Sequence, residues 1–181
     1  MKSVVRILLM VMLTAGMSSC EKIRNLFDIK VDTVIEGNLF IQVDEVQVKA
    51  VPPVYAFDES VTIDVLNDDL YEYENEIQDF QVSGATIEVL SVSDDPITFL
   101  AGTEFTMSNA NHTIVWTLSS DWPITVGTTL DLADEGLVDD IEAILNDMLP
   151  FTLSAVGTCD VQGAAIGLLL GIETTVIVNP S

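Results

Sequence analysis

The sequence predicts one antiparallel β-sandwich of eight or nine strands with two short helices. Apolar and polar residues alternate over most of the chain, which is the pattern of strands that bury one face. Turn signals containing Gly, Pro, Asn or Asp recur about every 8–12 residues, a spacing typical of all-β folds. Only two segments carry apolar residues at helical spacing. These three observations favour a sandwich over a helical or α/β fold.

The first strands are expected over residues 27–35 and 39–43. The Gly-Asn pair at 37–38 predicts a turn between them. Two adjacent prolines predict a break in regular structure over 50–57, because proline lacks the backbone N–H that a strand ladder needs. Alternation resumes over 59–67, which we expect to form a further strand.

Two helices are predicted, over residues 67–80 and 134–150. The first would begin with Asn67 as its N-terminal cap and places apolar residues at helical spacing. The second has the clearer amphipathic pattern and would stop at Pro150. Its apolar stripe consists of Leu137, Ile141, Ile144, Leu145 and Met148.

Alternating segments between and after the helices predict the remaining strands. They cover residues 84–92, 97–102, 104–109, 112–120, 151–157 and 166–178. The last two are expected to form a hairpin, because the sequence DVQG between them is typical of a turn. The final segment contains Glu173 and alternating β-branched residues, which favours a central strand over a membrane-spanning helix.

Residues 1–19 have the three zones of a secretory signal. Lys2 and Arg6 give a positive start, an apolar run follows, and a short run rich in small residues precedes Cys20. A transmembrane anchor is the alternative. Only thirteen uncharged residues separate Arg6 from Cys20, fewer than the roughly 20 that a membrane-spanning helix needs. We therefore expect a signal peptide.

The segment MSSC, which ends at Cys20, resembles the lipobox of bacterial lipoproteins. Met17 stands where that motif usually has leucine, and Ser19 fits the small position before the cysteine. The resemblance implies that the Cys20 thiol is acylated and that the mature chain begins there. The acyl chains would attach the protein to a membrane, because each buried methylene adds about 0.8 kcal/mol. Residues 20–26 would then form the acylated cysteine and a tether, and 27–181 a single domain.

The overall layout resembles the small acylated, β-rich lipoproteins of Bacteroidota, many of which have unknown functions. In that group, a run of acidic residues directly after the cysteine usually marks export to the cell surface. The segment CEKIRN, which begins at Cys20, lacks such a run. The resemblance therefore implies an outer-membrane lipoprotein that faces the periplasm. It assigns no functional residue besides Cys20.

The chain has 29 acidic and six basic residues, a formal charge of −23. This charge excludes nucleic acid as a partner, because binding it requires basic side chains that neutralise phosphates. The segment from Glu59 to Asp69 superficially resembles the acidic turns of bacterial cadherin-like modules, whose acids can ligate calcium. It lacks their Asp/Gly-rich continuation, and no segment matches an EF-hand loop. We expect divalent cations to act as weak counterions, with specific calcium binding as the alternative.

The sequence contains no constellation typical of catalysis, metal ligation or cofactor binding. A serine triad would have to use His112, the only histidine, which we expect in a turn before a strand. No G-x-S-x-G elbow and no phosphate-binding glycine loop is present. Cys159 lies in an alternating segment, which predicts a buried thiol rather than a reactive one. We therefore expect no enzymatic activity, no metal ligands and no cofactor.

These observations predict a non-enzymatic interaction or structural module of the cell envelope, held at the membrane through Cys20. Another envelope protein or a glycan is the expected partner. The alternative is a lipoprotein that captures calcium or a glycan. Two tryptophans bear on this choice, because an exposed indole can stack on a sugar ring. We expect Trp116 to be buried in a strand and Trp122 to lie in a loop, where its ring can be exposed.

Overall fold

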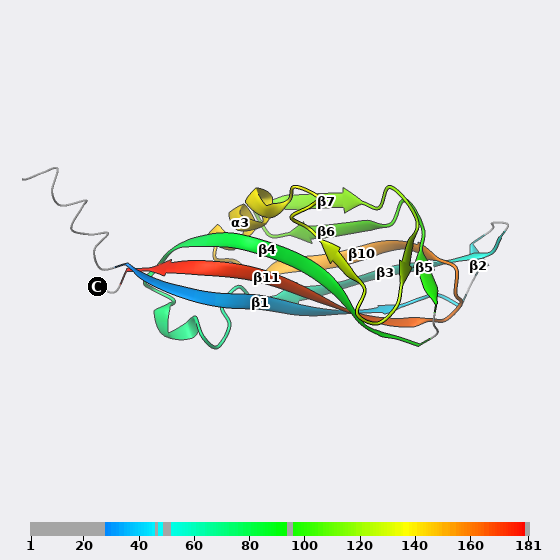
Figure 1. Cartoon of the computed structure of the whole chain (residues 1–181), viewed down its shortest axis with the longest axis horizontal. Coiled ribbons are helices and arrows are strands. Elements are labelled where there is room, and N and C mark those ends of the chain that lie inside the picture. Colours follow the sequence, from blue (N-terminus) through cyan, green and yellow to red (C-terminus); the bar gives the residue numbers. More distant parts are fainter. Residues whose placement is uncertain (1–27, 46, 49–51, 94–95, 180–181) are drawn as a thin grey trace, which may run out of the picture.

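The computed structural model describes residues 28–45, 47–48, 52–93 and 96–179 (Figure 1). Two antiparallel sheets pack face to face around one apolar core, which confirms the predicted β-sandwich. These residues contain eleven strands. The number exceeds the predicted eight or nine because four strands span only two or three residues, too few to show alternation.

The first sheet, sheet A, has four strands in the order β1, β11, β4, β9. Their bounds are β1 Ile29–Gln42, β4 Ile77–Val92, β9 Thr129–Asp131 and β11 Ala165–Val178. The central strand, β11, pairs with β1 on one side and with β4 on the other, over nearly its whole length. Figure 1 shows these three long strands side by side. Sheet A is therefore a long ladder, interrupted only by register shifts in its pairing with β4.

The second sheet, sheet B, has seven strands, most of them shorter. Their bounds are β2 Gln47–Val48, β3 Val54–Ile63, β5 Ile97–Phe99, β6 Glu104–Ser108, β7 Thr113–Thr117, β8 Trp122–Ile124 and β10 Phe151–Cys159. Strand β10 pairs with β3 along one edge. Along its other edge it pairs first with β6 and then, at Cys159, with β5. The break predicted over 50–57 is shorter than expected, since β3 begins directly after the two prolines.

Strand β1 continues through the Gly-Asn pair, so the turn predicted at 37–38 is wrong. All residues from Ile29 to Gln42 pair in register with β11. Gly37 belongs to the buried face of the strand, and a Cβ atom there would lie only 2.5 Å from Cγ1 of Ile63 in β3. The glycine therefore serves the close packing of β1 against β3 rather than a turn.

The helix predicted over 67–80 is also wrong. A short 3-10 turn, η1 (Tyr71–Tyr73), is followed directly by β4. The Asn67 amide donates to the Val34 carbonyl at 3.1 Å and so links this segment to β1. From its first residue β4 pairs with β11, and Phe80 is fully buried. Pairing of β4 with the central strand β11 therefore outweighs the helical preference that the spacing of the apolar residues indicates.

The second predicted helix is present as α3 (Val138–Asn146), shorter than expected. Its buried residues are Ile141, Ile144 and Leu145, which belong to the predicted apolar stripe. Side chains of Asn146 and Glu142 accept hydrogen bonds from the backbone N–H groups of Phe80 and Val82, at 2.8 and 2.9 Å. The helix thus covers part of the β4 edge. No helix in the described part of the chain is long and apolar enough to cross a membrane.

The last two strands alternate as predicted but do not form the predicted hairpin. Strand β10 belongs to sheet B and β11 to sheet A, so the turn at 160–163 carries the chain from one sheet to the other. Both edges of β11 are already occupied, by β1 and by β4. No edge of β11 is left for β10, which pairs with β3, β6 and β5 in the other sheet instead.

Candidate functional site

The predicted lipid anchor lies outside the described residues. The signal peptide, the tether and Cys20 all fall within residues 1–27, which the structure does not describe. Acylation of Cys20 therefore stays a prediction from the sequence.

His112 lies in the turn between β6 and β7, as predicted. Its Nε2 atom is 3.6 Å from Oδ2 of Asp147. Asn109 holds the turn together: its Oδ1 accepts from the His112 N–H at 2.8 Å, and its amide donates to Asp147 at 2.9 Å. These contacts give His112 a structural role, which connects the β6–β7 turn to the end of α3.

Cys159 is fully buried, which confirms the prediction for its thiol. Its Sγ donates a hydrogen bond to the Val161 carbonyl at 3.2 Å. Burial raises the pKa of the thiol above its ordinary value of 9.0, and the negative charge of Asp160 acts in the same direction. A neutral, inaccessible thiol is a poor nucleophile, so the geometry does not favour chemistry at Cys159.

The segment from Glu59 to Asp69, considered for calcium, runs from β3 toward η1. Oδ1 of Asp64 accepts from the Leu66 N–H at 3.2 Å, and Oδ1 of Asn67 accepts from the Asp69 N–H at 3.1 Å. Both side chains therefore fold back on the neighbouring backbone, as is common in turns. No group of three or more His, Cys, Asp or Glu residues is placed to hold a metal ion within the described ranges.

The two tryptophans differ in how well the sequence predicted them. Trp116 is buried, as expected, and stacks on Phe105 with ring centroids 5.0 Å apart. Trp122 lies in strand β8 rather than in a loop, so that prediction is wrong. Because β8 lies at the edge of sheet B and pairs with β5 alone, it can contain Pro123, although proline has no backbone N–H to donate. The Trp122 ring is half-buried and packs on Phe99, with ring centroids 5.9 Å apart.

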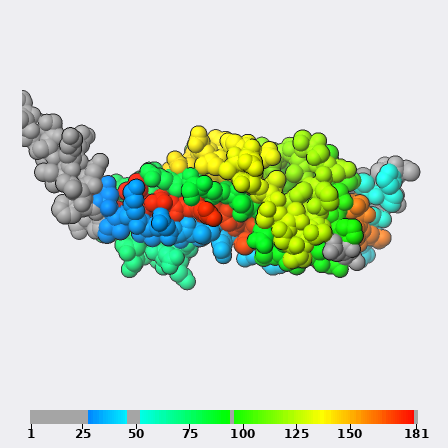
Figure 2. Space-filling view, in the orientation of Figure 1, coloured from blue at the N-terminus to red at the C-terminus, as the bar shows by residue number. Residues whose placement is uncertain are grey.

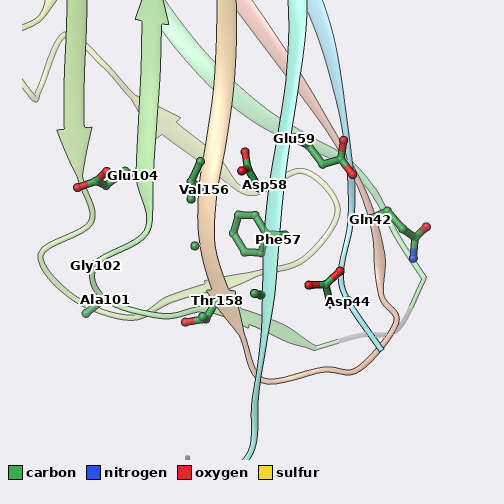
Figure 3. A pocket seen from close by; sticks show the side chains of 12 residues that line it. Gln42, Asp44, Phe57, Asp58, Glu59, Ala101, Gly102, Glu104, Val156 and Thr158 are labelled. Atoms are coloured by element: carbon green, nitrogen blue, oxygen red, sulfur yellow. The ribbon is translucent and has the colours of Figure 1, made fainter. Parts of the chain in front are cut away.

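A depression of about 440 Å³ lies on sheet B where the pairing of β10 changes from β6 to β5 (Figure 3). Between these two partners the β5–β6 loop takes the place of a strand, and the Leu100 N–H donates to the Thr158 carbonyl at 3.0 Å. Gly157 permits this close approach. A Cβ atom there would lie 2.8 Å from Cβ of Thr103, which is fully buried.

Four carboxylates are among the residues that line this depression. The strand register places Asp58 of β3 and Glu104 of β6 on either side of Val156 in β10. Val156 is 44% exposed, which is unusual for a residue in a central strand. Figure 3 shows that Asp44 and Glu59 lie on the other side of β3, toward β1. We call these four carboxylates and Val156 the acidic depression.

Among the described residues, no basic side chain compensates the negative charge of the acidic depression. None of its four carboxylates takes part in a hydrogen bond or ion pair with a described residue. Lys30 is the one lysine in the described part of the chain, and that part has no arginine. Lys30 lies at the opposite end of β1 from Gln42, which borders the depression, roughly 40 Å away at 3.3 Å per residue. The site therefore offers unpaired negative charge beside apolar surface.

A hollow of about 290 Å³ on sheet A gives a useful contrast. It lies at a register shift between β11 and β4, and its lining includes Asp32, Ser83 and Glu173. Here Oδ1 of Asp32 accepts a hydrogen bond from the Thr175 hydroxyl at 2.7 Å. One of its two carboxylates is thus already engaged, so this hollow is a weaker candidate for binding a partner.

The acidic depression could not be found from the sequence, because it joins residues from positions 44, 58, 59, 104 and 156. Alternation indicates that Asp58 and Val156 point outward, but not that their strands are neighbours. Comparison with family models finds no match to this chain, and comparison with curated proteins finds none either. A function for the chain must therefore be argued from the geometry of its surface.

Proposed function

We propose that the protein is a non-enzymatic interaction module of the cell envelope that binds a basic segment of another envelope protein. One observation carries the proposal: Asp58 and Glu104 flank the exposed Val156 in a concave part of sheet B, and neither carboxylate is paired with a described residue. The sequence of residues 1–20 supports the rest of it, an acyl anchor on Cys20 that holds the domain at the outer membrane, facing the periplasm.

The chemistry of the depression suits a lysine or arginine side chain. Neighbouring strands place facing Cβ atoms about 4.5–5.5 Å apart, so Asp58 and Glu104 lie roughly 10 Å apart across Val156. A cationic head group between them would interact with both carboxylates, and a guanidinium can bind each in a bidentate manner. The exposed Val156 side chain offers apolar surface to the methylene stem.

The openness of the site favours binding over catalysis. Asp58 and Glu104 are exposed on the surface of the sheet, where water competes for them and weakens electrostatic stabilisation of a transition state. We propose that divalent cations act at this surface only as weak counterions. A fixed calcium site would require several oxygen ligands converging at 2.3–2.6 Å.

Cross-linking followed by affinity purification from native membranes tests the binding site. The double variant Asp58→Asn/Glu104→Gln removes two charges from the depression with little change in side-chain shape. The control Glu36→Gln/Glu173→Gln removes the same charge from exposed positions on sheet A. We expect the wild type and the control to capture the same partner, and the depression variant to lose it. Equal capture by both double variants would contradict the proposed site.

Membrane fractionation tests the anchor separately. Cys20→Ser removes the thiol that would be acylated, so the protein should leave the membrane fraction while its fold is unchanged. A variant that stays fully membrane-bound would contradict acylation at Cys20 without affecting the proposal for the depression.

A further inference from the structure

Strand β7 is an edge strand without the features that usually protect an edge. The described strands at sheet edges are β1 and β9 in sheet A, and β2, β7 and β8 in sheet B. Three of these have only two or three residues. The longer β1 contains charged residues, and its Val34 carbonyl already accepts from the Asn67 amide. Strand β7 contains no charge, proline, glycine or register shift, and Figure 1 shows it at the margin of the molecule, beyond β6.

The backbone groups of β7 are divided between β6 and the free edge. Directly after β7, the Leu118 N–H donates to the Thr103 carbonyl at 2.9 Å. In an antiparallel pair every second residue bonds to the neighbouring strand, so Thr113, Val115 and Thr117 direct their N–H and C=O groups away from β6. None of these groups is bonded to a described residue. Three donors and three acceptors are therefore available to a further strand.

The side chains along this edge favour an extended and cationic neighbour. Thr113, Val115 and Thr117 are β-branched and exposed, which suits pairing with another strand. No acidic residue occurs from 105 to 120, although the chain has 29. The register places Glu104 of the acidic depression beside Thr117. A strand beyond β7 would lie two strand spacings, roughly 10 Å, from Glu104. An extended lysine or arginine side chain can cross Thr117 and reach that carboxylate.

We propose that the basic segment that binds the acidic depression does so by adding a strand to the free edge of β7. The inference rests on the proposed function, because it describes how the same partner is held. Backbone hydrogen bonds to Thr113, Val115 and Thr117 would supply affinity without regard to sequence. The carboxylate of Glu104 would select a cationic residue at the position opposite Thr117.

A second copy of this chain fits the edge less well. The pattern Thr-x-Val-x-Thr is symmetrical about Val115, so two β7 strands could pair in antiparallel orientation. Each copy has a formal charge of −23, which opposes association. Figure 1 shows β1 and β7 both running along the long axis. Antiparallel pairing would therefore point the two β1 strands in opposite directions, and the ends nearest the proposed Cys20 anchors would not face one membrane.

Binding of a defined peptide to the purified full chain tests the inference. The probe is a labelled peptide of about ten alternating lysine and valine residues, followed by fluorescence anisotropy. We expect saturable binding, and none of a matched glutamate–valine peptide. Val115→Pro removes the central N–H of the free edge and no bond to β6, so it should weaken binding roughly 10-fold with a nearly unchanged melting temperature. Val115→Thr keeps that N–H and should bind within about 2-fold of the wild type.

Amide hydrogen exchange of the wild type gives a measurement that does not depend on the folding of a variant. The lysine peptide should slow exchange at Thr113, Val115 and Thr117, and the glutamate peptide should not. Unprotected amides in the saturated complex, or wild-type affinity in Val115→Pro, would overturn strand addition. So would absence of saturable binding by the wild type.

The variant Asp58→Asn/Glu104→Gln separates failure of this inference from failure of the proposed function. We expect it to weaken binding of the lysine peptide as well. Binding that is lost in this variant but kept in Val115→Pro would leave the acidic depression as the binding site and overturn strand addition. Binding that is lost only in Val115→Pro would support strand addition and contradict the role of the depression.

Discussion

Sheets A and B differ in the continuity of their ladders, and the acidic depression follows that difference. In sheet A, β11 has a strand partner on both sides over nearly all of its fourteen residues (Figure 2). In sheet B, the corresponding long strand, β10, changes partner from β6 to β5, and a loop fills the interruption. The acidic depression lies at that interruption. Sheet A is therefore the more continuous ladder, whereas sheet B contains the depression that we propose as the binding surface.

The loops near the interruption also bring the depression close to a groove of about 200 Å³ whose lining includes Trp116 and Trp122. The Gly102 N–H donates to the Leu118 carbonyl, and the Leu118 N–H donates to Thr103, each at 2.9 Å. Asp121, in the groove, accepts a hydrogen bond from Ala101, in the depression. These hydrogen bonds connect the loop of the depression to the segment that follows β7.

Truncating the centre of sheet A should have the largest effect on stability. Leu168 is 1% exposed, and Leu168→Ala should reduce the free energy of unfolding by about 2–5 kcal/mol through lost burial and a cavity. The next residue, Leu169, points to the half-buried outer face, so Leu169→Ala should cost clearly less. Urea unfolding of both variants checks this, and similar losses would mean that the core does not follow the alternation of β11.

Adding a methyl group to one glycine in each sheet directly compares the two ladders. A Cβ at Gly157 would lie 2.8 Å from Cβ of Thr103, whereas the nearest atom to a Cβ at Gly171 is 3.8 Å away. Gly157→Ala should therefore destabilise the protein by about 1–3 kcal/mol. Gly171→Ala should be neutral or slightly stabilising. Thermal unfolding measures both, and a harmless Gly157→Ala would show that the loop does not pack against β10 as described.

Salt should stabilise the protein, because repulsion among 29 acidic residues is opposed by few basic ones. The screening length falls from about 30 Å at 0.01 M to about 8 Å at 0.15 M salt. Relief of roughly 1 kcal/mol would raise the melting temperature by about 2–4 °C. Asp58→Asn/Glu104→Gln should show a smaller salt response than Glu36→Gln/Glu173→Gln if charge is concentrated in the depression.

At millimolar concentration, calcium and magnesium should raise the melting temperature alike. A saturable rise in melting temperature that is selective for calcium would instead indicate a specific site.

The smallest expected effect is the pH response of Cys159 in sheet B. Its folded pKa is raised above 9.0, so the unfolded thiol ionises first as the pH rises. The stabilisation of the neutral thiol is thus fully present below pH 9.0 and is lost as the pH rises through the folded pKa. Urea unfolding at about pH 8 and pH 10.5 should show that the advantage of the wild type over Cys159→Ala shrinks. Rapid labelling of the native thiol would refute its burial.

The sequence predicted what depends on alternation and missed what depends on pairing. Alternation indicated the sandwich, the buried faces of β10 and β11, and the burial of Trp116 and Cys159. Local rules failed where a distant strand decides the structure, as at Gly37, where close packing on Ile63 replaced the expected turn. They failed again over 67–80, where residues 77–80 pair with β11 as the start of β4 and the preceding residues form turns and the 3-10 segment η1. Neither concave region has a local signal, because each forms only when separate strands and loops meet.

Site-specific photo-cross-linking in native membranes would test most directly whether sheet B presents the binding surface. A photoreactive phenylalanine analogue is placed at Val156, in the acidic depression, or at Leu169, on the outer face of sheet A. We expect illumination to yield a discrete cross-linked partner from position 156 and none from position 169, and the adduct should disappear in the Asp58→Asn/Glu104→Gln background. An adduct from position 169 alone, or one from position 156 that persists without the two charges, would contradict a charge-dependent binding surface on sheet B.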